Sequence, residues 1–268
     1  MRDAIPLRTD NCQLRTDNCQ LFSRIARNLR YTWFMNDQPT LAPLQIELRE
    51  AMADPGCPLC RLAARAERNF VDSLNYERVL DLKTRDALKA SRGLCARHTR
   101  QWQALQGSAL SMAIVYRVSI LDLLRDTETL PQAKLWRRGK DAAQLAQALE
   151  PDGPCLVCEI GAGTVQRFAD LLLKDLPDPA VQTLLRDCGG LCVPHLRLAL
   201  TRPGAGKQYR LLIDVHRAAW QTLMGELDEF IRKNDYRFRH EKLGETEADA
   251  WLRALDTMVG MDAKLKKR

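Results

Sequence analysis

The amino-acid sequence predicts an all-α protein made of two similar tandem units, each of about four helices. Apolar residues recur at the helical period along almost the whole chain, and no stretch alternates as a β-strand does. Aromatic residues make up only 6% of the 268 residues, whereas Ala, Leu and Arg are plentiful, which favours helices over strands. One pattern of cysteine and histidine occurs twice, nearly 100 residues apart. A pattern repeated at this period indicates a tandem repeat.

The composition indicates a folded protein without a membrane span. A hydrophobic content of 46% suffices to bury a core, and the length fits one large domain or two ordinary ones. No stretch of about 18 consecutive apolar residues is present, and no secretory signal is evident. We therefore expect a cytoplasmic protein. In that compartment, paired cysteines are more often metal ligands or redox thiols than disulfides.

The net charge of +7 is concentrated at the two ends of the chain. Residues 1–34 carry +3 and residues 262–268 carry another +3, so the body between them is nearly neutral. A basic face for nucleic acid would need its charge on the folded body. Nucleic acid is thus a disfavoured partner, and a protein partner is the leading expectation.

The first 34 residues contain an identical heptapeptide twice in succession, at residues 7–13 and 14–20. Two such repeats with one apolar position each do not make a coiled coil. We expect residues 1–34 to be a mis-assigned or non-functional extension, with the functional chain opening at Met35. The alternative is that residues 21–34 form a basic amphipathic helix that touches a membrane or a partner.

The first unit, residues 35–135, shows helical patterns broken by turn signals. Helices are expected at residues 42–53, 60–74, 82–91, 94–105 and 108–126. The chain breaks near Asp81, and Gly93 precedes the fourth helix. Pro131 and Gly139 mark the connector to the next unit.

The second unit, residues 136–260, repeats this plan before a basic tail at residues 261–268. Helices are expected at residues 158–176, 180–187, 191–200 and 209–230. Pro177 and Pro179 form the central break, because proline cannot continue a helix. Phe70 and Phe168 lie 98 residues apart, which supports the repeat beyond the cysteines.

Each unit carries a Cys-x2-Cys pair, a long gap and a Cys-x2-His pair. The first set is Cys57, Cys60, Cys95 and His98, and the second set is Cys155, Cys158, Cys192 and His195. Cysteines at the start of a helix form thiolates readily, and residues at i and i+3 share a helix face. We expect the two pairs of each set to meet within their own unit. If the residues between them form two antiparallel helices, the chain returns to the point where the first helix began.

Three thiolates and one imidazole make a complete tetrahedral shell for Zn²⁺, so two zinc sites are expected. An iron–sulfur cluster is the alternative, although the usual run of closely spaced cysteines is absent. A closed shell leaves no position for a substrate water, so these metals are expected to be structural and not catalytic. Cys188 is interpreted as a plain cysteine, and His216, on an apolar helical stripe, as a core histidine.

The polar segment at residues 235–251 is a second candidate site. It mixes aromatic side chains with both signs of charge, and its candidate ligand-binding residues are Asp235, Tyr236, Arg237, Arg239 and Glu241. The two arginines would hold an anionic group. The competing interpretation is a surface loop pinned to the body by its aromatic rings.

These motifs resemble an uncharacterised bacterial family, a domain of unknown function. The resemblance covers about residues 42–260. It rests on paired Cys-Pro-x-Cys and Gly-Leu-Cys-x2-His units, the segment Phe230–Phe238 and a Trp-containing last helix. The second cysteine pair departs from the pattern, because Leu156 stands where the first pair has Pro58. The resemblance implies no activity.

Three functions are compatible with the sequence. A zinc-containing binding or adaptor module leads, because no catalytic constellation is visible beyond the metal shells. A thiol-redox protein or redox-switched chaperone is the first alternative, since zinc-bound thiolates can be oxidised. The second is an enzyme that uses His240, Glu241 or Asp249 as acid–base groups.

Overall fold

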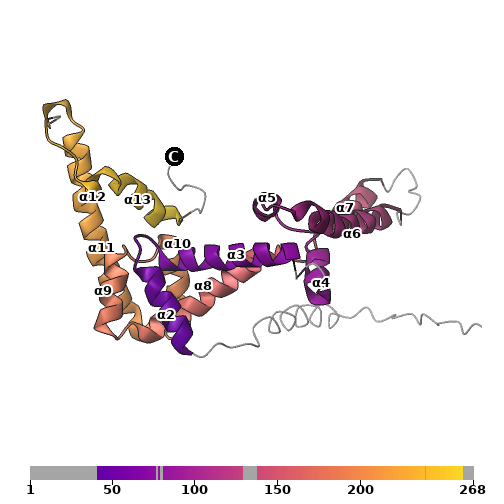
Figure 1. Cartoon of the computed structure of the whole chain (residues 1–268), viewed down its shortest axis with the longest axis horizontal. Coiled ribbons are helices and arrows are strands. Elements are labelled where there is room, and N and C mark those ends of the chain that lie inside the picture. Colours follow the sequence, from indigo (N-terminus) through magenta and orange to yellow (C-terminus); the bar gives the residue numbers. More distant parts are fainter. Residues whose placement is uncertain (1–40, 77, 79–80, 129–137, 239, 262–268) are drawn as a thin grey trace, which may run out of the picture. The chain divides into compact units, whose positions relative to one another are not determined.

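The computed structural model describes residues 41–76, 78, 81–128, 138–238 and 240–261 (Figure 1). The chain divides into two compact units, residues 1–44 and 45–268. The first unit contributes only residues 41–44, the first turn of a helix, to the described structure, and both candidate sites discussed below lie in the second. The expected extension at residues 1–34 and the tail from residue 262 onward lie outside the described residues.

The described residues are almost wholly helical and include no strand, as the sequence predicted. The helices are α2 (Leu41–Met52), α3 (Pro58–Tyr76), α4 (Leu82–Ala90), α5 (Ala96–Gln103), α6 (Ser108–Glu128), α7 (Arg138–Ala148), α8 (Leu156–Asp175), α9 (Pro179–Asp187), α10 (Val193–Leu200), α11 (Ala205–Lys233), α12 (Glu245–Ala248) and α13 (Ala250–Val259). A single turn of 3₁₀ helix, η4 (Tyr236–Phe238), follows α11. Helix α7 occupies part of the expected connector. Gly139 lies in its first turn and does not break it, and residues 140–148 contain neither glycine nor proline.

The order long helix, short helix, short helix, long helix occurs in α3–α6 and again in α8–α11. The matching helices also begin alike. The side chain of Asp81 caps α4 by accepting from the backbone of Thr84, and the side chain of Asp178 caps α9 by accepting from that of Ala180. The predicted breaks in the chain are therefore real helix starts.

Helices α3 and α8 pack side by side and form the centre of the structure (Figure 1). They run in opposite directions, because Phe70 and Leu74 near the end of α3 pack with Leu156 and Val157 at the start of α8. Helix α5 packs on α3, and helix α10 packs on α8. This antiparallel pairing determines which cysteines meet.

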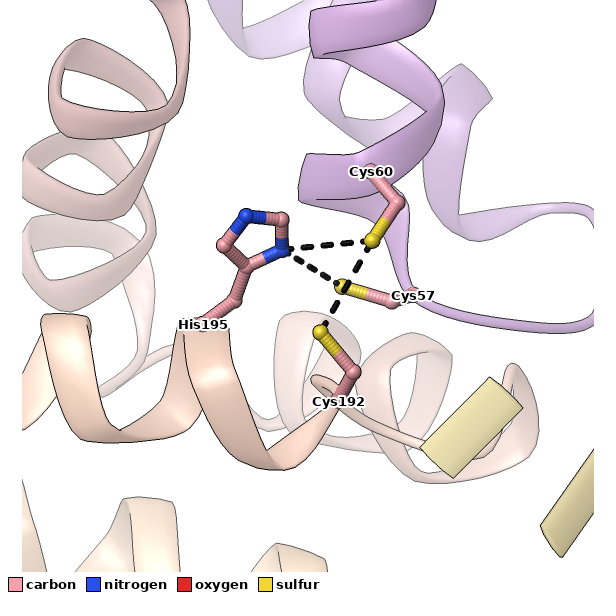
Figure 2. A group of neighbouring side chains, drawn as sticks. All are labelled: Cys57, Cys60, Cys192 and His195. Carbon is pink, nitrogen blue, oxygen red and sulfur yellow. Dashed lines mark hydrogen bonds between the residues drawn. The ribbon is translucent and has the colours of Figure 1, made fainter. Parts of the chain in front are cut away.

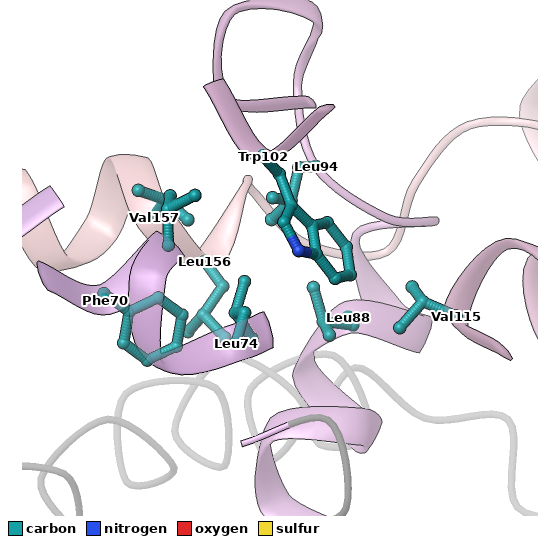
Figure 3. Packing of buried hydrophobic residues seen from close by; sticks show 9 residues of the cluster. Phe70, Leu74, Leu88, Leu94, Trp102, Val115, Leu156 and Val157 are labelled. Atoms are coloured by element: carbon teal, nitrogen blue, oxygen red, sulfur yellow. The ribbon is translucent and has the colours of Figure 1, made fainter. Parts of the chain in front are cut away.

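A buried cluster joins the end of α3 and the start of α8 to α4, α5 and α6 (Figure 3). Trp102 of α5 is fully buried at its centre, next to Leu88 of α4 and Val115 of α6. Burial of an aromatic ring and several aliphatic side chains stabilises the fold by roughly 1.5–3 kcal/mol for each side chain. Side chains from three sequence-distant segments thus hold the start of α8 in place.

Candidate metal centres

The first candidate centre, site 1, consists of Cys57, Cys60, Cys192 and His195 (Figure 2). Cys57 and Cys60 lie at the start of α3, and Cys192 and His195 at the start of α10. Nδ1 of His195 lies 3.4 Å from Sγ of Cys57 and 3.3 Å from Sγ of Cys60. Sγ of Cys60 lies 3.7 Å from Sγ of Cys192.

The second candidate centre, site 2, consists of Cys95, His98, Cys155 and Cys158. Nδ1 of His98 lies 3.3 Å from Sγ of Cys95, 3.5 Å from that of Cys155 and 3.4 Å from that of Cys158. Sγ of Cys95 lies 3.7 Å from Sγ of Cys158. The helix starts of α5 and α8 therefore build this site.

The expectation that each set converges within its own unit is wrong, because the structure exchanges the half-sites. Helix α3 has 19 residues but α4 has only 9, so the chain cannot run back along α3 to its start. Helix α5 instead lies near the end of α3, where antiparallel α8 begins. The cysteine pair of each half consequently meets the Cys-x2-His pair of the other.

The geometry of both sites fits a four-coordinate zinc ion. In each site, one ligand atom from each of the four residues lies within 4.8 Å of all the others. Tetrahedral Zn–S bonds of about 2.3 Å and Zn–N bonds of about 2.0 Å place two sulfurs about 3.8 Å apart and a nitrogen about 3.5 Å from a sulfur. The distances above match this shell. They are too long for disulfides, whose sulfurs lie about 2.0 Å apart.

The acid–base state of the sites also suits a cation. In site 2, burial opposes ionisation of Cys155, but a hydrogen bond with His98 lowers the pKa of this thiol to about 6. Burial and the neighbouring charge of Cys155 raise the pKa of Cys158 to about 12. Adjacent thiolates repel one another, and a divalent cation between them removes this repulsion. Two Cys/His groups of this structure can therefore hold metal ions.

Glu67 of α3 contacts the imidazole of His98 at Nε2, the ring nitrogen that faces away from the sulfurs of site 2. Its side chain is buried, with Oε2 3.3 Å from Nε2 of His98 and Oε1 3.0 Å from the guanidinium of Arg97. Burial alone would raise the pKa of Glu67, but its contacts with His98 and Arg97 lower it. A carboxylate at Nε2 fixes the imidazole so that Nδ1 faces the sulfurs.

Gly161 of α8 makes room for this carboxylate. A Cβ atom at position 161 would lie 2.3 Å from Oε1 of Glu67. The sequence did not identify Glu67 as part of a site. The signal that could have found it is a glycine inside a helical pattern, which marks the close approach of another group.

Each Gly-Leu-Cys turn is held by a ring from the long helix that follows it. His216 of α11 is fully buried, and its Nε2 accepts a 2.8 Å hydrogen bond from the backbone of Leu191, while Nδ1 donates to the carbonyl of Leu212. The sequence interpretation of His216 as a core histidine fits these contacts. Tyr116 of α6 occupies the corresponding place beside Gly93, where a Cβ atom would lie 2.5 Å from its ring.

The candidate ligand-binding residues of the 235–251 segment pair with neighbouring charges. Arg237 contacts Asp235 at 2.7 Å, and Glu241 contacts Arg232 of α11 at 2.6 Å. Tyr236 is 79% exposed, and Arg239 lies outside the described residues. The ligand-binding role of these residues stays a prediction.

Cys188 lies apart from both ligand groups, at the end of α9. Its thiol donates to the carbonyl of Leu185, and burial raises its pKa to about 11. This environment suits a protonated, structural thiol, as the sequence interpretation holds.

Fold and sites together define an all-helical protein with two candidate Cys₃His metal centres. The model of a family of unknown function (DUF6062) matches residues 43–264, and the chain belongs to this family. The resemblance noted from the sequence is thereby confirmed. No curated protein matches the chain, and no solved structure matches it. None of the helices among the described residues has the length and apolar character needed to cross a bilayer.

Proposed function

We propose that this chain is a cytoplasmic protein with two structural zinc ions that acts as a binding or adaptor module. The proposal rests chiefly on one observation. In each of two groups, three cysteine sulfurs and one imidazole nitrogen lie within 4.8 Å of one another, as the ligands of a single metal ion do. Four protein ligands close the shell of a structural zinc site and leave no position for a substrate. The free thiols fit a reducing compartment.

The zinc ions would act as cross-links between the two halves of the chain. Each ion would join a cysteine pair from one half to a Cys-x2-His pair from the other. Structural zinc contributes on the order of 10 kcal/mol in small domains, comparable with the whole stability of a folded protein.

Metal analysis of protein purified without chelator tests the proposal. Two zinc ions per chain support it, and a chain that folds and contains no zinc contradicts it. Iron with visible absorbance would identify the iron–sulfur alternative, which uses the same eight residues.

A thiol-redox or redox-switched chaperone function is the second candidate, favoured by the partly exposed cysteines of site 2. Two thiolates would lose two electrons and form one disulfide, while hydrogen peroxide takes up these electrons with two protons and becomes two waters. Thiol counting and metal release after peroxide treatment test it. Unchanged thiols and retained metal would exclude it.

An enzyme that uses residues 235–251 is the third candidate. In this reading Asp249 or Glu241 would act as an acid–base group, although their carboxylates pair with Arg253 and Arg232. A ligand screen that compares the native chain with Arg237→Ala tests it. Identical binding profiles would count against an enzyme here.

A further inference from the structure

We propose that the two metal ions have different roles, with site 2 the place where metal enters and leaves and site 1 a covered structural site that exchanges its metal slowly. This proposal rests on the proposed function, because it takes both sites to hold metal. The class of molecule that would act at site 2 is a small ligand with a thiolate or a chelating nitrogen, which can take zinc from protein sulfur.

Site 1 is closed on the side of its sulfurs. Cys57 is 3% exposed and Cys192 is 1% exposed, whereas Cys60 is partly buried like the cysteines of site 2. Gly260, which follows α13, lies so near that a Cβ atom there would be 3.4 Å from Sγ of Cys60 and 3.5 Å from Sγ of Cys192. Residues 250–261 therefore form a cover over this site, which we call the C-terminal cover.

The C-terminal cover is fastened to the body of the protein. Helix α13 packs on α10, which carries two ligands of site 1, and on α11. Arg253 of α13 forms a 2.7 Å ion pair with Glu226 of α11. The side chain of Met261 packs against Gly56, where a Cβ atom would lie 2.6 Å from the methionine sulfur. Access to site 1 from the side of its sulfurs therefore requires the cover to lift.

Site 2 has the opposite arrangement. Its imidazole side is closed, because His98 is fully buried and is backed by Glu67. Its three cysteines, Cys95, Cys155 and Cys158, are all only partly buried. The histidine would keep a leaving or arriving ion in place while sulfur ligands are exchanged one at a time.

Ligand exchange at zinc makes this difference in access decisive. An incoming ligand would have to reach the group of protein ligands before it could replace one of their thiolates at the metal. At site 2 the ligand can approach past partly exposed sulfurs. At site 1 a local opening of the C-terminal cover must come first, and local openings cost free energy.

Two variants and the native chain test the assignment. Metal content is measured first on native protein that has been loaded with zinc and desalted, and a value below two ions per chain after loading would overturn the proposed function itself. Zinc release to the coloured chelator 4-(2-pyridylazo)resorcinol is then followed over time. We expect two phases, with Cys57→Ser retaining the fast phase of site 2 and Cys95→Ser retaining the slow phase of site 1. The rates should differ by about tenfold or more, since site 1 requires local opening. Equal rates, or the reverse assignment, would overturn the division of roles.

Thiol labelling of the unaltered protein gives an independent readout that does not depend on the folding of a variant. N-ethylmaleimide is added to the metal-loaded chain, and modified peptides are quantified by mass spectrometry over time. Cys95, Cys155 and Cys158 should be labelled before Cys57 and Cys192. Labelling of site 1 at the same time as site 2, or before it, contradicts the proposal.

The role of the C-terminal cover is tested by Gly260→Val, with Gly204→Val as the control for a positive φ. Both glycines have a positive φ, +90° and +96°, so both substitutions strain the backbone. The strain is larger at Gly260, whose ψ of 158° lies in a region that only glycine adopts readily, than at Gly204, whose ψ is −18°. Only position 260 faces the sulfurs, whereas nothing lies within 4 Å of a Cβ atom at position 204. Gly260→Val should bring the release rate of site 1 to within about threefold of that of site 2, since the opening step is removed, and Gly204→Val should leave it unchanged. An unchanged slow phase in Gly260→Val would overturn the role of the cover.

Discussion

Sγ of Cys60 lies 3.7 Å from Sγ of Cys192, although 132 residues separate them along the chain. Cys95 and Cys158 form the corresponding pair at the other site, also at 3.7 Å. Neither pair joins two cysteines of the same half of the molecule. The two halves of this protein are thus linked to each other at both candidate metal sites.

Removal of metal should destabilise the whole described fold and not one half of it. Each ion would join both halves, so its loss would remove the link between α3 and α10 or between α5 and α8. We expect chelation to lower the free energy of unfolding by several kcal/mol, up to about 10. Urea unfolding followed by circular dichroism, with and without chelator, measures this. Coincident curves would contradict it, and addition of zinc to the chelated sample should restore the original curve.

Substitution of Glu67 by Gln should weaken metal binding at site 2 alone. Gln keeps the shape of the side chain but lacks the negative charge that supports the imidazole of His98. Loss of such a supporting carboxylate lowers metal affinity by about 10–100-fold.

Competition titrations with a chelator of known affinity measure both sites of this variant. Site 1 is an internal control, because Val165 lies 98 residues after Glu67, at the corresponding place in α8. Equal weakening at both sites would show that Glu67 acts through the general stability of the fold.

Gly161→Ala and Gly163→Ala should have opposite effects on stability. Alanine favours a helix over glycine by about 0.5–1 kcal/mol, and a Cβ atom at position 163 meets nothing within 4 Å. At position 161 the same atom would displace Glu67 from its contacts with His98 and Arg97, at an expected cost of about 1–3 kcal/mol.

Thermal unfolding of the two metal-loaded variants compares them directly. Gly161→Ala should unfold at a lower temperature than the native chain, and Gly163→Ala at the same or a higher one. If Gly161→Ala unfolded at a higher temperature than the native chain, the carboxylate of Glu67 would not depend on the space that Gly161 leaves beside α8.

The stability provided by His216 should fall as the solution is acidified. Burial lowers the pKa of this histidine below its ordinary value of about 6.5, so it stays neutral in the folded state. Below pH 6.5 the unfolded chain binds a proton that the folded chain does not, and stability therefore declines as the pH falls. The contribution is complete above pH 6.5.

Comparison with His216→Gln separates this effect from the titration of the metal ligands, which both proteins share. The difference in unfolding free energy between native and variant protein should shrink below pH 6.5, by at most about 1.4 kcal/mol per pH unit. A difference that is constant from pH 7.5 to pH 5.5, or that grows on acidification, would contradict the assignment of a neutral imidazole.

Much of the fold was predictable because it depends on local signals. Apolar spacing located the long helices, and the structure places helix starts at the predicted breaks near Asp81 and at Pro177 and Pro179. The eight candidate ligand residues were also evident from their spacing. Their grouping was not, because it depends on the antiparallel packing of α3 and α8, a relation between residues such as Phe70 and Leu156 that no local pattern specifies.

Glu67 escaped prediction for a similar reason. A single glutamate in a helical pattern is normally a solvated charge. Only the fold shows that this carboxylate is buried against His98, and that Gly161 gives it space. Pairing across the molecule and burial of charge are both consequences of tertiary packing.

The exchange of half-sites is tested most directly by counting zinc ions in two double variants. Cys57→Ser with Cys192→Ser alters two ligands of site 1 and leaves site 2 intact, so one zinc ion per chain should remain. Cys57→Ser with Cys95→Ser alters one ligand in each site, so both ions should be lost or held far more weakly. The opposite result, with one ion retained by Cys57→Ser/Cys95→Ser and none by Cys57→Ser/Cys192→Ser, would show that each half of the chain binds its own metal.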